Sequence, residues 1–142
     1  MIPRDRQALF RVAHWTMTTN RKSLKTIRQL AETEEDYLLI VRELDRVGAQ
    51  LQRARTLGAE ATLTLVDWLT TLDHFNWRCS YCESREFRVM SHFLSLPLGG
   101  TTPENCVPAC YTCGRFRRKE NSRVSAYLAQ VKSRDKNAEK ER

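Results

Sequence analysis

Four cysteines in two close pairs are the residues of this 142-residue chain whose types and spacing most clearly predict chemistry. The pairs are Cys79-Ser-Tyr-Cys82 and Cys110-Tyr-Thr-Cys113, and the 27 residues 83 to 109 lie between them. Two Cys-x-x-Cys pairs can supply four thiolates to one tetrahedral zinc ion, and in a reducing compartment paired cysteines are more often metal ligands than disulfides. The sequence therefore predicts one structural zinc site, and we expect the fifth cysteine, Cys106, to be a buried core thiol.

The segment between the pairs contains two further residues with chemical potential. Residues 86–93 are strand-like and include His92, and residues 98–105 form a turn-rich stretch that ends at Asn105. A neutral imidazole can take a proton from water near neutral pH, provided that a partner on its other nitrogen fixes the tautomer. The structural alternative is a histidine that is hydrogen-bonded between a small strand and a loop.

The order of these features resembles the zinc-bearing branch of the HNH endonucleases. The resemblance covers about residues 65–120 and rests on Cys-x-x-Cys, a strand ending in His, Pro-x-Gly-Gly, Asn, and Val-Pro-Ala-Cys-x-x-Cys. It implies a β-hairpin and a helix that form a ββα-metal site beside the zinc and cleave phosphodiester bonds in DNA. By position, His92 resembles the general base that activates water, and Asn105 resembles the residue that fixes the loop and orients this histidine. The resemblance also implies one catalytic Mg²⁺ or Mn²⁺ ion.

The chain departs from the family pattern at two positions that usually supply ligands to this catalytic ion. Ser91 stands before the histidine, where the family usually has Asp, Glu or His, and Gly114 follows the last cysteine, where it usually has His or Asn. Neither residue offers a carboxylate or imidazole to a hard cation, so cleavage is left open. Other residues that could rebuild a ligand set are Asp73, His74, Glu83 and Glu104.

A basic run follows the second cysteine pair directly. Its cations are Arg115, Arg117, Arg118 and Lys119. Cations on a helix beside an HNH-like site would contact the phosphates of nucleic acid, with double-stranded DNA as the expected partner. A solvated surface is the alternative interpretation of such a run.

The elements that must position these residues predict an α+β fold. Residues 1–63 are expected to be helical, with short helices at 4–15 and 22–30 and a long helix at about 34–57. We expect a zinc-stapled, HNH-like ββα-metal domain at 64–121. An amphipathic helix with a charged tail should follow at 122–142. Thr33 is the expected cap of the long helix, and Thr64 with Asp67 is expected to cap a helix that leads to the first cysteine pair. An apolar stripe on the long helix should pack against one of the two short helices, or alternatively form a coiled-coil dimer. Its members are Tyr37, Ile40, Leu44, Val47, Leu51 and Ala54.

The composition favours a polyanionic partner. The chain has 24 Lys and Arg against 17 Asp and Glu, and residues 110–142 alone contain 10 basic and 4 acidic residues. No apolar run approaches the roughly 20 residues of a membrane span, so we expect an intracellular, cytoplasmic protein without membrane contact.

Three functions fit these observations. The first is an HNH-like zinc protein that binds DNA through an altered active site. The second is a catalytically inactive DNA-binding or complex-scaffolding subunit, whose N-terminal helices bind a protein partner or a second copy. The third is a zinc-ribbon module for protein interaction.

Overall fold

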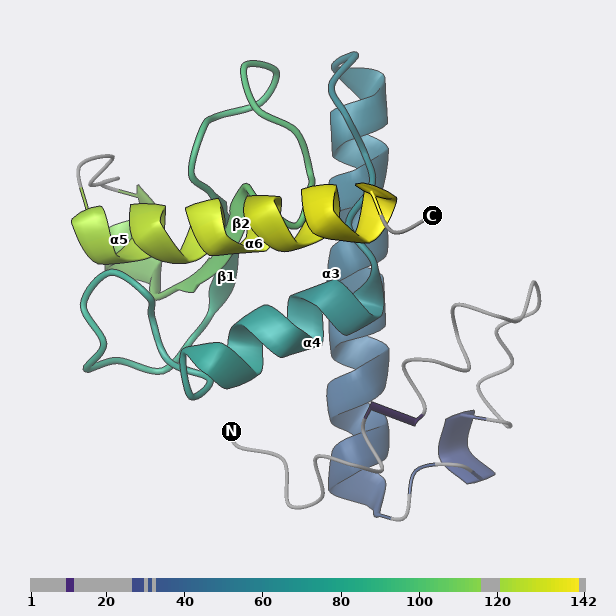
Figure 1. The fold of residues 1–142 in the computed structure, drawn as a ribbon. Helices are drawn as coiled ribbons and strands as arrows, with labels where there is room; N and C mark the ends of the chain where they lie inside the picture. Colours follow the sequence, from purple (N-terminus) through teal and green to yellow (C-terminus); the bar gives the residue numbers. More distant parts are fainter. Residues whose placement is uncertain (1–9, 12–26, 30, 32, 116–120, 141–142) are drawn as a thin grey trace.

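A computed structural model describes residues 10–11, 27–29, 31, 33–115 and 121–140, with side chains as far as residue 134. Its labelled elements are helices and one small antiparallel sheet, as expected for the α+β class (Figure 1). The predicted short helices at 4–15 and 22–30 lie largely outside the described residues.

Helix α3 (Glu34–Thr56) begins and ends where local signals predict. The Thr33 side chain accepts a hydrogen bond from the backbone N–H of Asp36 at 3.1 Å, and three acidic residues occupy the first turn, where the helix dipole favours negative charge. After the helix, Gly58 has a φ of 72°, a left-handed conformation that favours glycine and is common just beyond a helix end. The boundary near residue 57 is therefore confirmed.

The apolar stripe of α3 faces the interior. Most of the described residues that pack against it lie outside the two short N-terminal helices. Helix α4 (Leu65–His74) crosses α3, and a complete capping box between Thr64 and Asp67 starts it, as predicted. Trp68, Leu69 and Leu72 of α4 join the stripe in one core, to which Ile27 and Ala31 also belong. The stripe thus packs mainly within the chain.

A two-stranded antiparallel hairpin carries the candidate site. Strands β1 (Val89–His92) and β2 (Cys106–Ala109) pair with Val89 opposite Ala109 and His92 opposite Cys106. Side chains alternate between faces: Met90 and Cys106 enter the core beside α3 and α4, whereas Val107 and Ala109 enter a second core around the cysteines. Cys106 is buried, as predicted. The helical part and the hairpin therefore share one continuous core, which includes residues from both sides of the expected boundary between residues 63 and 64.

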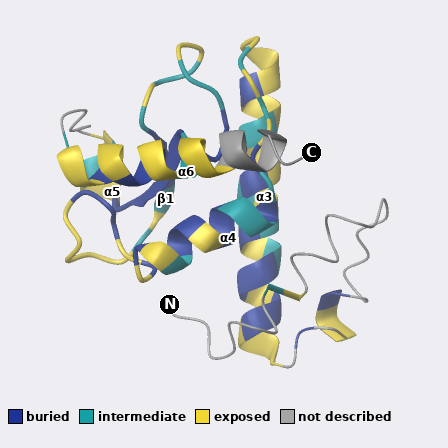
Figure 2. Ribbon diagram, viewed as in Figure 1, coloured by how far each residue is buried: buried dark blue, intermediate teal, exposed yellow. Residues whose placement is uncertain are grey.

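Two helices follow the hairpin. The short helix α5 (Tyr111–Arg115) contacts both strands, and α6 (Ser122–Lys140) runs in front of the hairpin in Figure 1. Val124, Tyr127 and Leu128 of α6 are buried in the second core. Buried residues, dark blue in Figure 2, lie on the sides of the helices and strands that face one another.

The C-terminal helix is longer than its amphipathic pattern indicates. We expected residues 133–142 to be a fraying charged tail, but α6 continues to Lys140. Lys, Arg, Ala and Glu have high intrinsic helix propensity, so the segment can stay helical without an apolar face. None of the described helices has the length and apolar character required to cross a membrane.

Candidate functional site

The four predicted zinc ligands lie together. The sulfur atoms of Cys79, Cys82, Cys110 and Cys113 are all within 4.8 Å of one another. Four sulfurs around a tetrahedral zinc ion at about 2.3 Å are about 3.8 Å apart, so this cluster needs only a small contraction to hold the ion. We call these four residues the cysteine cluster. It is compatible with a metal ion, and a set of four thiols favours zinc.

The thiols have different environments. Cys79 and Cys110 are buried, whereas Cys82 is exposed. Burial acts to raise the pKa of Cys82, but hydrogen bonds from the backbone of Arg85 and Ser84 and from the Ser84 hydroxyl outweigh it and lower this pKa to about 6. Because zinc binds the thiolate, such donors prepare the exposed sulfur for metal binding at neutral pH.

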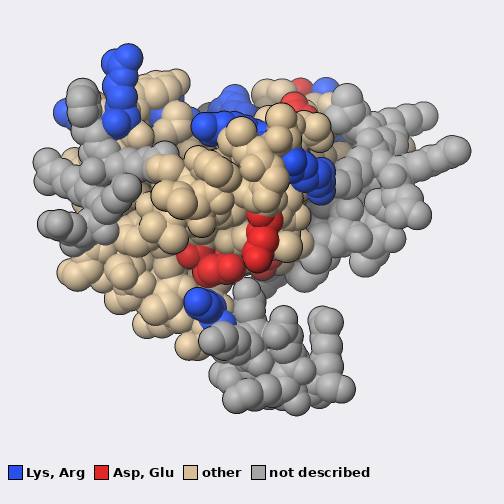
Figure 3. All heavy atoms as spheres, turned by 90° about the horizontal axis from the view of Figure 1, so that it is seen from above, with Lys and Arg blue, Asp and Glu red and all other residues tan. Residues whose placement is uncertain are grey.

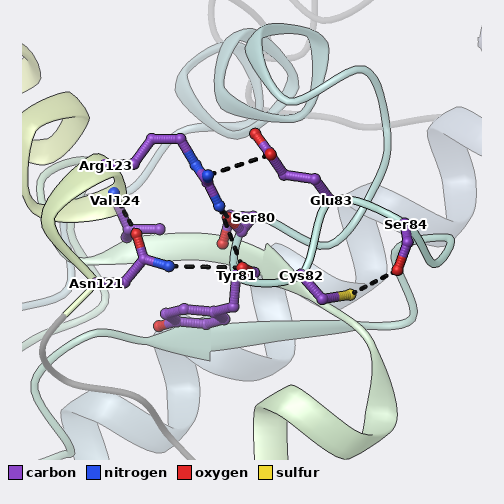
Figure 4. A network of polar contacts seen from close by, with 8 residues as sticks. All are labelled: Ser80, Tyr81, Cys82, Glu83, Ser84, Asn121, Arg123 and Val124. Carbon is purple, nitrogen blue, oxygen red and sulfur yellow. Dashed lines mark hydrogen bonds and ion pairs between the residues drawn. The ribbon is translucent and has the colours of Figure 1, made fainter.

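The start of α6 is attached to the first cysteine pair (Figure 4). Arg123 donates from Nη2 to the carbonyl oxygens of Ser80 and Tyr81 at 3.2 and 3.1 Å, and its Nη1 forms an ion pair with Glu83 at 3.1 Å. Asn121 caps α6 by accepting from the backbone N–H of Val124 at 3.0 Å. The loop that carries Cys79 and Cys82 and the first turn of α6 therefore support each other.

The predicted base, His92, is enclosed. Only 3% of the residue is exposed, and its Nε2 atom lies 2.9 Å from the Oγ1 atom of Thr101. The single hydroxyl proton of Thr101 is donated to the carbonyl oxygen of Gln50 at 3.0 Å, so Nε2 must be the donor to Thr101. In this arrangement Nε2 carries a proton and cannot accept one from water.

The two positions that depart from the family pattern have different surroundings: Ser91 is buried, whereas Gly114 is partly exposed. Ser91 is 5% exposed, and its hydroxyl lies 3.4 Å from the hydroxyl of Tyr81. A Cβ atom at Gly114 would lie 2.8 Å from the Cγ2 atom of Val89, so a side chain there requires Val89 to move. Ser91 is therefore buried, and a side chain at residue 114 could be added only if Val89 shifted.

Asn105 holds the loop between the strands. Its Oδ1 accepts from the backbone N–H of Leu94 at 2.8 Å, and its Nδ2 donates to the carbonyl oxygens of Leu94 and Gly100 at 2.9 and 2.8 Å. Asn105 therefore joins the two ends of this loop.

The other candidate ligands do not form a metal site in the described part of the chain. Within the described ranges, the cysteine cluster is the only group of three or more His, Cys, Asp or Glu residues placed to hold one ion. Glu83 pairs with Arg123, and the ring of His74 stacks on that of Tyr127.

The predicted cationic run is described only in part. Arg115 is exposed at the end of α5, whereas Arg117, Arg118 and Lys119 lie outside the described residues. On the face seen from above, Lys and Arg lie in separate places around a largely uncharged surface (Figure 3). Basic charge is therefore dispersed on this face.

Comparison with known proteins adds no family. Models of protein families, curated proteins and solved structures give no match to this chain. The functional interpretation therefore rests on the residues themselves.

Sequence reasoning did not identify three residues that hold the site. The role of Asn121 could have been predicted, because an Asn before an amphipathic stretch is a common helix cap. Arg123 and Thr101 had no such signal: the carbonyl oxygens to which they donate lie 42, 43 and 51 residues away in the chain, so only the fold brings them together.

Proposed function

We propose that this protein is an HNH-like zinc module that binds DNA through its phosphates and does not cleave it. A structural zinc at the cysteine cluster holds the hairpin, α5 and the start of α6 together. The observation that carries the proposal is the contrast between four thiols grouped to hold one metal and a neighbouring His92 whose Nε2 is occupied by Thr101.

The charge and position of the basic run support DNA binding. Arg115 is the first of four cations within five residues, and it is exposed directly after the second cysteine pair. A zinc bound between the pairs would fix the start of this run relative to the hairpin. Cations fixed in this way contact phosphates with little dependence on base sequence and with strong dependence on salt.

Three features oppose cleavage. The general-base position is buried, the preceding position is a serine engaged with Tyr81, and the position after the last cysteine has no side chain and faces Val89. Hydrolysis of a phosphodiester needs a metal ion to stabilise the developing charge, and these positions would supply neither its ligands nor an accessible base.

The binding test compares two sets of three substitutions with equal charge. In the first, Arg115, Arg118 and Lys119 are replaced by Ala; in the matched control, the exposed Arg42, Arg53 and Arg55 of α3 are replaced by Ala. Affinity for a short duplex is measured by fluorescence anisotropy over a series of salt concentrations. We expect the first set to reduce the magnitude of the slope of log affinity against log salt by about 3, and the control to change it by less than about 1. Equal effects of both sets would contradict the proposed phosphate contacts.

A further inference from the structure

The anchored loop between β1 and β2 exposes leucine side chains to solvent. Asn105 anchors both ends of this loop through Leu94 and Gly100, and a Cβ atom at Gly100 would lie only 2.5 Å from the carbonyl oxygen of Glu60. Leu98 is nevertheless 84% exposed, and Leu94 is 50% exposed. Fixing a loop costs conformational entropy, and an anchored loop that leaves leucines in water is typical of a binding surface.

These leucines border a groove. It has a volume of about 500 Å³ and lies between the loop, residues 58–60 after α3, and one face of α6. Leu94 and Leu98 line the side of the loop, and Leu128 and Ala129 line the side of α6. We call this the leucine groove. Its lining combines these apolar side chains with polar and charged ones, and it comes from three separate segments of the chain.

The charged residues that line the leucine groove indicate the chemistry of the molecule that binds there. Glu60 and Glu104 line it, and among the described side chains Lys132 is the only cation in the lining. Over the part of the chain that the structure describes, neither carboxylate has a recorded ion pair. Acidic side chains also lie near the centre of the face in Figure 3. Free carboxylates beside exposed leucines repel phosphate backbones and anionic lipids, and they attract Lys and Arg.

We propose that the leucine groove docks an amphipathic helix of a protein partner. Apolar side chains at helical spacing would contact Leu94 and Leu98, and flanking Lys or Arg residues would face Glu60 and Glu104. An apolar groove lined by side chains recognises a helix through anchors at steps of three and four residues. This interaction does not depend on the proposed DNA binding, because its residues are separate from the basic run.

The test uses synthetic peptides and the full-length, zinc-loaded protein. A fluorescent peptide of about 18 residues, with Leu on one helical face and Lys on the other, is compared with a Leu and Glu peptide of the same pattern. The proteins are wild type, Leu98→Ser, the double variant Glu60→Gln with Glu104→Gln, and Leu38→Ser. Leu38 is an exposed leucine on α3 outside the groove and serves as the matched control.

We expect the Leu and Lys peptide to bind wild type and Leu38→Ser alike. Leu98→Ser and the double variant should each weaken this binding by about tenfold or more, and the Leu and Glu peptide should bind at least about tenfold more weakly. The proposal is overturned if the Leu and Lys peptide does not bind wild type, if Leu98→Ser has no effect, or if both peptides bind equally.

Two further measurements exclude other occupants. A dimer of the wild type in sedimentation equilibrium that Leu98→Ser abolishes would assign the groove to a second copy and overturn the proposal. Loss of duplex binding in Leu98→Ser would show that the loop binds DNA, and this outcome would also overturn the proposal. Duplex binding that is unchanged in Leu98→Ser while peptide binding is lost separates the two functions and supports the leucine groove.

Discussion

The Nε2 atom of His92 lies 2.9 Å from the Oγ1 atom of Thr101 at the end of the loop between β1 and β2. Since Thr101 also donates to the carbonyl oxygen of Gln50, this one hydroxyl connects the end of β1 to α3. The histidine at the predicted catalytic position thus stabilises the packing of the hairpin on the helical part.

This connection predicts that Thr101→Val is strongly destabilising. Valine keeps the shape of the fully buried threonine, but it leaves the His92 N–H without a partner and removes the second hydrogen bond to the Gln50 carbonyl, which should cost about 2 kcal/mol of unfolding free energy. Urea unfolding followed by circular dichroism measures the loss. The control is Thr56→Val, which removes only an exposed bond to the Gln52 carbonyl and should change stability by less than about 0.5 kcal/mol. Equal stability of Thr101→Val and wild type would contradict this role.

The contact between α4 and α6 predicts a dependence of stability on pH. The ring of His74 stacks on that of Tyr127 at a centroid distance of 4.1 Å, and burial, followed by the charge of Arg134, lowers the pKa of His74 below 6.5. The unfolded chain therefore binds this proton more readily than the folded protein. The contribution of His74 to stability is present above about pH 6.5 and is lost as the pH falls below it.

The variant His74→Phe isolates this effect, because phenylalanine keeps an aromatic ring beside Tyr127 and removes the titration. Urea midpoints at about pH 7.5 and about pH 5.5 should differ more for wild type than for the variant. The cysteine thiols titrate in both proteins, so their contribution cancels in the comparison. The same pH dependence in both proteins would show that His74 is not responsible.

The cysteine cluster predicts that zinc holds the C-terminal half of the fold. Cys79→Ser or Cys110→Ser places a poorer ligand at a buried position, so each should reduce the bound zinc below one ion per chain. Structural zinc contributes on the order of 10 kcal/mol in small domains, so the hairpin and α6 should unfold before α3 does. Metal analysis and amide hydrogen exchange measure the two effects.

Cys106→Ala is the control for the zinc prediction. Cys106 is buried in the other core, outside the cysteine cluster, so this variant should keep one zinc while losing some stability. Four freely titratable thiols in the native wild-type protein would rule out the zinc site.

The parts of the fold that the sequence predicted correctly depend on neighbours in the chain. The capping box of Thr64 and Asp67 spans three residues, and the stripe of α3 repeats every three or four. The cysteine cluster was predictable because each pair forms its own turn, so only the meeting of the two pairs had to be assumed.

The parts that were missed depend on distant contacts. The Cβ space at Gly114 is limited by Val89 on another element, and the tautomer of His92 depends on a carbonyl oxygen of α3. The packing of α4 on α3 was not predicted, because several helices carry apolar faces and periodicity alone does not choose between them. The length of α6 was underestimated because propensity, not amphipathicity, supports its last turns.

The burial of Ser91 and the contact of residue 114 with Val89 predict that installing the metal ligands implied by the resemblance will not produce cleavage. The double variant Ser91→Asp with Gly114→Asn would bury a carboxylate beside Tyr81 and press a side chain against Val89, so we expect a loss of roughly 2 kcal/mol in stability and no nicking of plasmid with Mg²⁺ or Mn²⁺. Adding Val89→Ala relieves the contact at residue 114 and should recover part of the stability. Metal-dependent nicking by either variant would mean that missing ligands were the only defect.

The proposed function is tested most directly by one gel measurement on the zinc-loaded wild-type protein. Supercoiled plasmid is incubated with the protein at low salt with Mg²⁺ or Mn²⁺, and half of each sample is digested with protease before electrophoresis. A module that binds and does not cut should retard the undigested plasmid, release it as salt is raised, and leave it fully supercoiled after protease. Plasmid that is not retarded at low salt, or nicked circles that disappear in His92→Ala, would contradict the proposal.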